Sequence, residues 1–328
     1  MSDENTSLNF QTQTEDIGKR LDVFLSEKIE GWSRSRLQRL IAEGEVLVNQ
    51  KQAKSSYKLN EDDEIEVELA ELPATVFEPE NIPLDIVFED EFLAVINKPA
   101  GMIIHPGAGI PSGTLANAIA WHFKFQIPNS KLEDKEIPNP KSQIPNRLGV
   151  VHRLDKDTSG LIVVAKDERT SESLSGQFQS RKVYKSYVAL VHGMVERNSG
   201  KIEAPIARDK FNRLKMSVQK DGRSALSLWK ARQRFEKFTL LDVEIKTGRT
   251  HQIRVHLAYI NHPIVGDKIY NEGRDNTVNN DDVRRAIQNL NRFFLHAEKL
   301  GFTHPATKEK MNFTAPMPDE LTEFLELI

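Results

Sequence analysis

The chain contains no cysteine, which excludes disulfide bonds and metal sites built on thiolate ligands. A protein without cysteine is suited to a reducing compartment. No apolar run approaches the roughly 20 residues that a membrane-spanning helix requires. Residues 1–5 are polar and partly acidic, and the N-terminus lacks the apolar segment of a secretory signal. These absences predict a cytoplasmic protein with no membrane segment.

Charge is unevenly distributed along the 328 residues, although the formal net charge is only −3. Residues 1–72 carry 9 basic and 16 acidic side chains, whereas residues 151–328 carry 30 and 23. Residues 181–254 alone hold 18 basic and 7 acidic side chains. A basic region of this kind suits a polyanionic ligand, although a solvated basic face would give the same count.

The residue patterns divide the chain into a small N-terminal domain and a larger one. Residues 1–16 are polar, and we expect a disordered tail. Residues 17–72 contain two helical patterns and two short strands, which form a unit near the minimum self-supporting size. Residues 73–83 include three prolines and are predicted to form a linker.

Residues 84–328 are predicted to form one α+β domain, because runs of strands with few helices do not fit a doubly wound sheet. Residues 292–297 are expected to be a core strand. Residues 127–146 repeat Ile-Pro-Asn three times among charged residues, which predicts a surface insertion. The main strand patterns lie at 184–191, 225–235 and 239–245, and helices are expected at 250–260 and 318–328.

The most informative stretch is residues 152–160, with the sequence HRLDKDTSG, followed by an apolar run that predicts a buried strand. It sets Asp155 between basic side chains and a Thr-Ser-Gly turn. A carboxylate held in this way is a candidate for catalysis. An aspartate near such a turn is also a common capping residue, so the motif alone leaves that role open.

Residues 246–257, with the sequence KTGRTHQIRVHL, form a second motif in which a turn leads from a strand into a helix. A helix start beside Arg249 and Arg254 is suited to binding an anion. Arginine can hold a carboxylate through both arms of its guanidinium while remaining charged. His251 and His256 lie on different helix faces, so we predict no metal site here.

A third candidate region is the strand at residues 182–191, which contains Tyr184 and Tyr187. Either tyrosine could be an ordinary half-buried strand residue. A tyrosine ring could also stack on a nucleobase while its hydroxyl reaches a base atom.

The stretch around Asp155 resembles the catalytic motif of the RluA/RluD-type RNA pseudouridine synthases, and residues 246–257 resemble the arginine motif of that family. The resemblance implies a mixed, mainly antiparallel sheet in the catalytic domain. It also implies that Asp155 carries out the isomerisation, that Arg254 pairs with its carboxylate and that Tyr187 is the active-site tyrosine. Arg153 is expected to fill the space vacated when the substrate uridine leaves the helical stack.

Residues 17–72 resemble the alpha-L RNA-binding module named after a small-subunit ribosomal protein, through the ordered stretches RLD, SRSR and GEVLVN. The loop that begins at His105 resembles one in the ribosomal-RNA branch of the synthase family. Both resemblances imply RNA contacts by residues of the two domains: Lys19, Arg20, Arg34, Arg36, Arg39, His105, His152, Arg153 and Arg249.

The resemblance therefore implies an enzyme that isomerises uridine to pseudouridine in large-subunit (23S) ribosomal RNA, free or within the assembling subunit. We expect a monomer that needs no cofactor, metal or energy source. Two other interpretations stay open: a transfer-RNA synthase of the same family, and a non-catalytic RNA-binding or ribosome-assembly factor. Whether Asp155 attacks carbon or removes a ribose proton also stays open.

Overall fold

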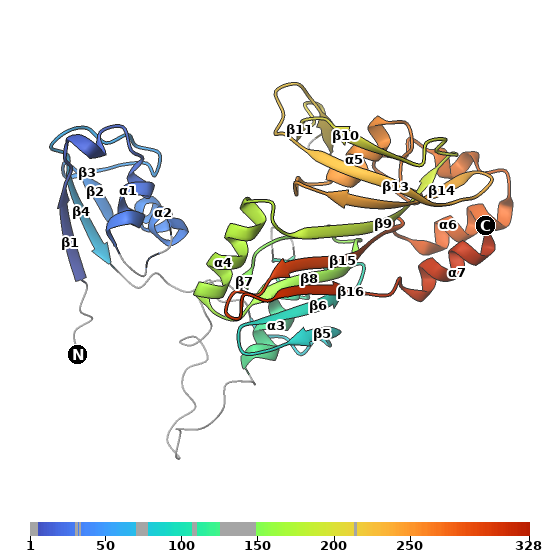
Figure 1. The fold of residues 1–328 in the computed structure, drawn as a ribbon, viewed down its shortest axis with the longest axis horizontal. Coiled ribbons are helices and arrows are strands. Elements are labelled where there is room, and N and C mark those ends of the chain that lie inside the picture. Colours follow the sequence, from blue (N-terminus) through green and yellow to red (C-terminus); the bar gives the residue numbers. More distant parts are fainter. Residues whose placement is uncertain are drawn as a thin grey trace, which may run out of the picture. The chain divides into compact units, whose positions relative to one another are not determined.

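The computed structural model describes residues 6–29, 32, 34–69, 78–106, 110–124, 149–212 and 215–328. The chain divides into two compact units, residues 1–74 and 75–328 (Figure 1). The predicted insertion at 127–146 lies outside the described residues. Among those residues, no helix is both long and apolar enough to span a membrane.

The N-terminal unit is a four-stranded antiparallel sheet with two helices. Its strand order is β1 (Thr6–Gln11), β4 (Glu64–Leu69), β2 (Val46–Val48) and β3 (Lys51–Gln52), and its helices are α1 (Leu21–Lys28) and α2 (Arg34–Glu43). In β4 the sequence alternates glutamate with Ile65 and Val67, whose side chains are fully buried. This period of two places one face of the sheet against the apolar faces of α1 and α2.

The prediction of a disordered tail at residues 1–16 is wrong over residues 6–16. Strand β1 pairs with β4 from Thr6↔Leu69 to Gln11↔Glu64, and a 3₁₀ turn at Thr14–Asp16 follows it. The alternating Leu8 and Phe10 pack against the core of the unit, a signal that the surrounding polar residues obscure. Residues 1–5 lie outside the described residues.

The predicted linker at residues 73–83 is also wrong in part, because residues 78–83 pack on the second unit, residues 75–328, which the motifs predict to be the catalytic unit. The side-chain amide of Asn117 donates to the carbonyl of Glu78 at 2.8 Å, and Glu80 accepts from the backbone of Gly113 at 3.0 Å. Residues 73–77 are outside the described part of the chain.

The catalytic unit is built on a large mixed sheet, which confirms the predicted α+β class. Every pairing in it is antiparallel except that between β15 and β8. The strand order is β10 (Ser199–Glu203), β13 (Leu226–Arg234), β14 (Phe238–Ile245), β9 (Tyr184–His192), β15 (Leu295–Thr303), β8 (Ser159–Ala165), β6 (Leu93–Lys98) and β5 (Ile86–Glu89). Strand β16 (Lys310–Thr314) pairs with β15, and β7 (Gly149–Val150) pairs with β8.

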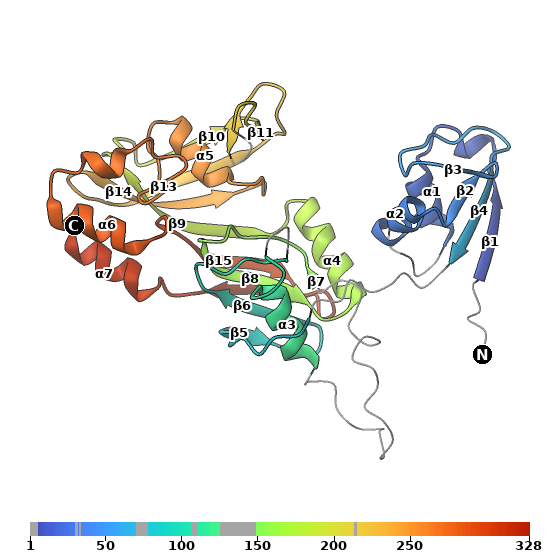
Figure 2. The same cartoon turned by 180° about the vertical axis from the view of Figure 1, so that it is seen from behind.

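Within the described residues of this unit, five α-helices and a hairpin accompany the sheet. The helices are α3 (Leu115–Lys124), α4 (Glu168–Gln179), α5 (Gln252–Tyr259), α6 (Asp281–Leu290) and α7 (Asp319–Leu327), and the hairpin joins β11 (Ile206–Arg208) to β12 (Met216–Val218). Helix α3 lies across β6 and β8, in front of them in Figure 2. The expected core strand at 292–297 begins later, because β15 starts at Leu295.

Strand β8, which follows Asp155, is buried on both faces, and this explains its uninterrupted apolar sequence. Ile162 and Val164 belong to the cluster that includes α3, and Leu161 and Val163 to the cluster that includes α4. Its parallel neighbour β15 approaches so closely that a Cβ on Gly160 would lie 2.3 Å from the carbonyl oxygen of Ala297. Glycine is therefore required there, at φ +110°.

Candidate active site

Asp155 lies in the turn that enters β8, and the surrounding backbone fixes this turn. The amide of Thr158 donates to the Asp155 carbonyl at 3.1 Å, and the amide of Gly101 donates to the carbonyl of Lys156 at 2.9 Å. Beneath the turn, the fully buried Lys98 donates three hydrogen bonds. Its acceptors are the backbone carbonyls of Pro99 (2.7 Å), Met102 (3.0 Å) and Lys156 (3.0 Å). The position of the carboxylate is thus set by the end of β6 as well as by its own turn.

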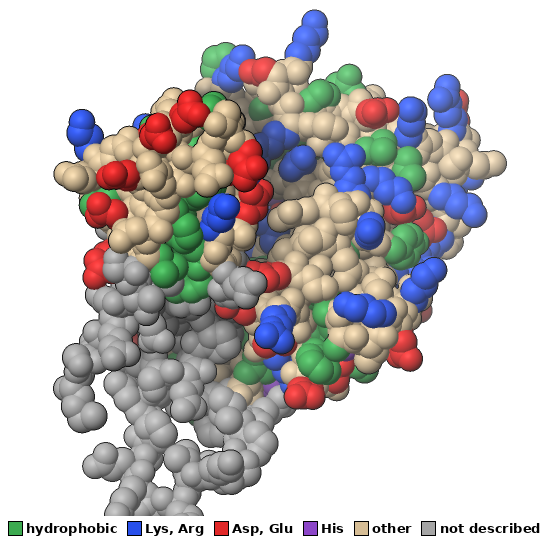
Figure 3. All heavy atoms as spheres, turned by 60° about the vertical axis from the view of Figure 1, so that its left-hand side comes forward, with side chains coloured by type: hydrophobic (Ala, Val, Ile, Leu, Met, Phe, Trp, Pro, Cys, Tyr) green, Lys and Arg blue, Asp and Glu red, His purple; other side chains and the backbone are tan. Residues whose placement is uncertain are grey.

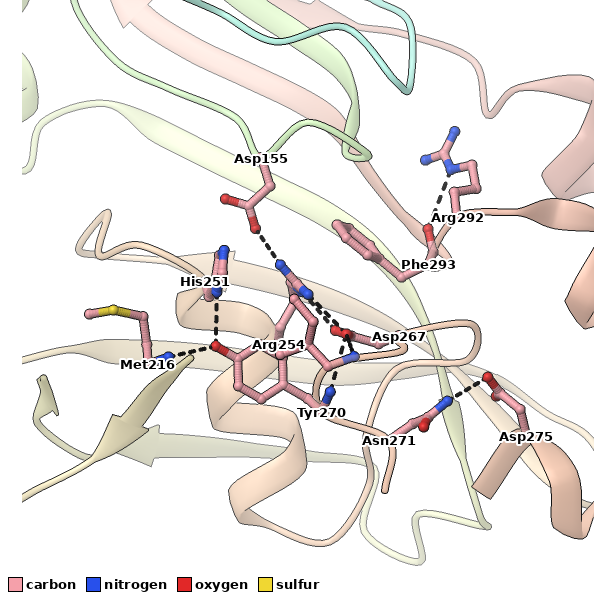
Figure 4. A network of polar contacts seen from close by, with 11 residues as sticks. Asp155, Met216, His251, Arg254, Asp267, Tyr270, Asn271, Asp275, Arg292 and Phe293 are labelled. Atoms are coloured by element: carbon pink, nitrogen blue, oxygen red, sulfur yellow. Dashed lines mark hydrogen bonds and ion pairs between the residues drawn. The ribbon is translucent and has the colours of Figure 1, made fainter. Parts of the chain in front are cut away.

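Arg254 reaches Asp155 from the first turn of α5, through Nη1 at 3.2 Å from Oδ2 (Figure 4). The turn between β14 and α5 presents it, because Gln252 accepts hydrogen bonds from the Thr247 hydroxyl at 2.7 Å and from the backbone of Arg249 at 3.1 Å. The side chain of Arg254 is 4% exposed, whereas that of Asp155 is 17% exposed. The carboxylate is therefore the member of the pair that solvent or a substrate can reach.

The fork of Arg254 is held by a second carboxylate, that of Asp267. Nε donates to Oδ2 at 2.6 Å and Nη2 to Oδ1 at 2.9 Å, and the Asp267 side chain is fully buried. Burial disfavours the charged guanidinium, but the hydrogen bonds and charge of Asp267 outweigh it and raise the pKa of Arg254. Arg254 thus binds Asp267 bidentately and offers its remaining arm to Asp155.

Two aromatic rings complete the surroundings of Arg254. The guanidinium carbon lies 4.9 Å from the ring centre of Tyr270 and 4.3 Å from that of Phe293 (Figure 4). Both distances suit cation–π contacts. The Tyr270 hydroxyl is also 2.8 Å from Nδ1 of His251 and accepts from the backbone of Met216 at 2.8 Å. These contacts therefore fix the position and the orientation of the Arg254 guanidinium plane.

Tyr187 lies on β9 and lines a small cavity of about 60 Å³ together with Asp155 and Arg254. Its side chain is buried, and this burial, with the nearby negative charge of Asp155, raises the pKa of the Tyr187 phenol. The phenol is consequently protonated at neutral pH. The structure thus brings together Asp155, Tyr187 and Arg254, which are far apart in sequence.

A larger cavity of about 1150 Å³ opens beside Asp155. Ligand sites usually occupy about 300–1,000 Å³, so this one has room for more than a single nucleotide. Its walls come from residues 100–105, 153–157, 251–254, 266–269 and 290–293, with Glu320. The cationic side chains on these walls are Arg153, Lys156, Arg254, Lys268 and Arg292. On the face drawn in Figure 3, Lys and Arg side chains gather over the right-hand part of the surface.

Three of the predicted RNA contacts of the catalytic unit lie at these cavities. The exposed Arg153 lines both, Arg249 lines the smaller and His105 lines the larger. The structure does not bring His152 to either. Its Nε2 accepts from the backbone of Val163 at 3.0 Å, and its ring stacks on Phe178 at 4.5 Å. Burial lowers the pKa of His152 to about 3, so the ring is neutral and supports β8.

In the N-terminal unit, the predicted basic residues are partly engaged in ion pairs. Arg20 and Arg34 both donate to the buried carboxylate of Asp22, with distances of 2.9–3.0 Å. Lys19 pairs with Asp16 at 2.9 Å and with Glu27 at 3.2 Å. The side chains of Arg36 and Arg39 lie outside the described part of the structure.

Sequence reasoning missed Asp267, Lys98 and Phe293. The Gly-Asp pair at 266–267 indicates only a turn, and a turn is what the backbone forms. Phe293 precedes β15, packs in the hydrophobic core and also lines the large cavity. For Lys98 the sequence did offer a signal of its role, because a lysine stands at the end of an otherwise apolar strand.

Comparison with known proteins settles the family. A sequence profile described as RNA pseudouridylate synthase matches residues 92–259. The chain belongs to the RNA pseudouridine synthase family. The enzyme is thus an RNA pseudouridine synthase, as the motif around Asp155 predicted. A second profile, that of the S4 domain, matches residues 19–65 and confirms the predicted type of the N-terminal module.

Several relatives match this synthase along nearly its whole length, and two of them illustrate the similarity. It is 37% identical over 319 residues to the uncharacterized RNA pseudouridine synthase YlyB of Bacillus subtilis (strain 168), and the match covers 97% of each chain. It is 40% identical over 330 residues to the ribosomal large subunit pseudouridine synthase D of Neisseria meningitidis (serogroup A, serotype 4A), over 100% of this chain and 83% of that protein.

Among solved structures, human RNA pseudouridylate synthase domain containing 4 resembles it with a TM-score of 0.55 at 23% identity. That match covers 74% of this chain and 91% of the human one, and it shows the shared fold.

Proposed function

We propose that this RNA pseudouridine synthase modifies uridines of large-subunit (23S) ribosomal RNA, and that Asp155 is its catalytic residue. The observation that carries the catalytic assignment is the ion pair of Asp155 with Arg254 on the wall of a cavity that can accept a nucleotide. The substrate assignment is supported by the several relatives, about 38% identical, that are named for large-subunit pseudouridine synthesis, and by the S4 domain.

In the proposed reaction the substrate uridine leaves its helical stack and enters the cavity beside Asp155, because its glycosidic bond is out of reach inside the stack. The exposed Arg153, on the rim of both cavities, takes the vacated place. Asp155 then attacks the nucleoside at carbon or removes a ribose proton. The bond from C1′ to N1 breaks, the base turns, and C1′ joins C5.

The protons gained and lost by the base limit what the other residues must do. C5 loses a proton and N1 gains one, so nothing is oxidised or added, and the reaction needs no cofactor. Arg254 orients the Asp155 carboxylate and neutralises part of its charge. Burial raises the pKa of Tyr187, so its phenol is protonated and can stack on the base and donate a hydrogen bond.

The test is the formation of pseudouridine by purified protein on two RNA sets: stem-loops of large-subunit ribosomal RNA and transfer-RNA transcripts. We expect product in the ribosomal set alone, and none with Asp155→Asn, whose amide is neither nucleophile nor base. Product confined to transfer RNA would show that transfer RNA is the substrate instead. An active Asp155→Asn variant would overturn the assignment of Asp155 as the catalytic residue. A monomer in the cytoplasm remains our expectation for the enzyme.

A further inference from the structure

The β11–β12 hairpin carries an aromatic side chain that nothing in the described structure covers. Phe211 is 99% exposed, whereas the other exposed large hydrophobic side chains of the described residues are 40–62% exposed. A phenylalanine in water forgoes the whole benefit of burial, roughly 1.5–3 kcal/mol. A ligand that covers the ring would gain this benefit.

The turn that presents Phe211 is built by hydrogen bonds. The carboxylate of Asp209 accepts from the backbone amides of Phe211 at 3.0 Å and Asn212 at 2.9 Å. The amide of Asp209 donates to the carbonyl of Lys215, and the amide of Lys215 donates to that of Asn212, both at 3.0 Å. These bonds fix the backbone of Phe211 and Asn212 relative to Asp209.

The base of the hairpin rests on the helix that carries Arg254. Ile206 packs with Val255 and Tyr270, and Met216 and Val218 lie against the same cluster. The backbone of Met216 donates to the Tyr270 hydroxyl, and the Tyr270 ring contacts the Arg254 guanidinium. The same cluster of packed side chains therefore contacts both Arg254, the partner of Asp155, and the hairpin that carries Phe211.

The charge of this segment points to the chemistry of the ligand. Residues 208–223 contain six basic and two acidic side chains, and one of the two acids, Asp209, is committed to the turn. A single exposed ring among cationic side chains is typical of surfaces that bind single-stranded nucleic acid, where bases stack on aromatic rings. A protein partner would instead require a contiguous apolar patch.

We propose that Phe211 stacks on an unpaired base of the substrate RNA, other than the uridine that is isomerised. This inference rests on the proposed function, because it assumes an RNA substrate longer than one nucleotide. The hairpin then fixes a second point of the RNA relative to Asp155, and the spacing between the two points selects which uridine enters the cavity.

The test uses the full chain and ribosomal stem-loops that the wild type modifies. Replacing an aromatic ring under a base costs about 5- to 150-fold in affinity. We expect Phe211→Ala and Phe211→Leu to weaken RNA binding by at least fivefold, and Phe211→Tyr to bind like wild type. The salt dependence of binding should be unchanged, because no charge is lost. Leu327→Ala, at another exposed apolar side chain, is the control and should bind normally.

At subsaturating RNA, the single-turnover rates of Phe211→Ala and Phe211→Leu should fall in parallel with their RNA affinity, because the ring contributes to RNA binding. Normal RNA binding by Phe211→Ala would overturn the proposal. Normal binding by Phe211→Leu together with a loss in Phe211→Ala would overturn base stacking, because it would show an apolar contact with the RNA that needs no aromatic ring. If the wild type modifies no ribosomal stem-loop, the proposed substrate is wrong. That outcome is distinct from a failure of the stacking proposal, in which the wild type modifies the stem-loops but Phe211→Ala binds them normally.

Discussion

Asp267 accepts two hydrogen bonds from Arg254, at 2.6 and 2.9 Å, and both side chains are buried behind the carboxylate of Asp155. The arginine is therefore positioned before any substrate arrives. Such a preorganised group costs no rearrangement during the reaction. Asp267 acts through Arg254, since its own side chain has no exposed surface.

Asp267→Asn should lower the single-turnover rate by more than tenfold while RNA affinity stays within about twofold of wild type. The amide breaks the charged fork, so Arg254 shifts away from Asp155. Removing one partner of a buried ion pair should also lower the free energy of unfolding by about 3 kcal/mol. Rapid-quench kinetics and urea unfolding measure the two effects.

Asp242→Asn is the matched control for that variant, because Asp242 pairs with Arg232 in a half-exposed position. Surface pairs contribute about 0–1 kcal/mol, so this variant should be nearly as stable and as active as wild type. An Asp267→Asn enzyme with a normal rate would show that the fork does not position the catalytic pair.

Tyr187 supports two roles that substitutions can separate. Tyr187→Phe keeps the ring and loses the hydroxyl, so it should lose one hydrogen bond to the base, about tenfold in rate. Tyr187→Leu also loses the stacking face, and we expect a loss of at least a hundredfold in single-turnover assays. Equal losses in both variants would assign the essential task to the hydroxyl and contradict the stacking role.

Lys98 makes the stability of the fold depend on pH with a defined sign. Burial, assisted by the charge of Arg292, lowers the pKa of Lys98 to about 7, whereas an unfolded lysine titrates near 10.4. Between these values the unfolded chain binds a proton that the folded protein lacks. Folding therefore becomes more favourable as the pH rises from about 7 to about 10, and the cost of burying the charge is full below pH 7.

Lys98→Met removes this titration. The stability of wild type relative to Lys98→Met should increase over that range by up to about 1.4 kcal/mol per pH unit. Urea unfolding at several pH values provides the measurement. Lys237→Met, at an exposed lysine, should show a constant difference from wild type. A constant or falling difference for Lys98→Met would mean that Lys98 keeps its proton throughout.

The parts of the site that were predictable from sequence are those that lie in contiguous motifs with a family resemblance. Asp155 and Arg254 each lie in a long motif of this kind. The strand pattern around Tyr187 does not distinguish it from an ordinary strand residue, so its assignment depended on the resemblance. Asp267 contributes through a contact that exists only after α5 and the following turn have folded together. No local pattern distinguishes such a carboxylate from an ordinary turn residue.

The dependence on contacts between distant residues also explains the errors in the predicted fold. Strand β1 has only Leu8 and Phe10 to mark it within a polar segment, and its pairing with β4 joins residues more than 50 positions apart. The continuous apolar strand β8 and helix α5 carried strong local signals and formed where predicted. His152 lies in the strongest motif, yet its neutral ring stacks on Phe178 away from the cavities.

The central claim, that Asp155 of this enzyme makes pseudouridine in large-subunit ribosomal RNA, is tested most directly in cells. Pseudouridines in total RNA would be mapped in three strains: one with the wild-type gene, one with a deletion and one with Asp155→Asn expressed at the wild-type level. We predict that specific large-subunit sites lose pseudouridine completely in both mutant strains and keep it in wild type. Large-subunit RNA with the same pseudouridines in all three strains would contradict the account.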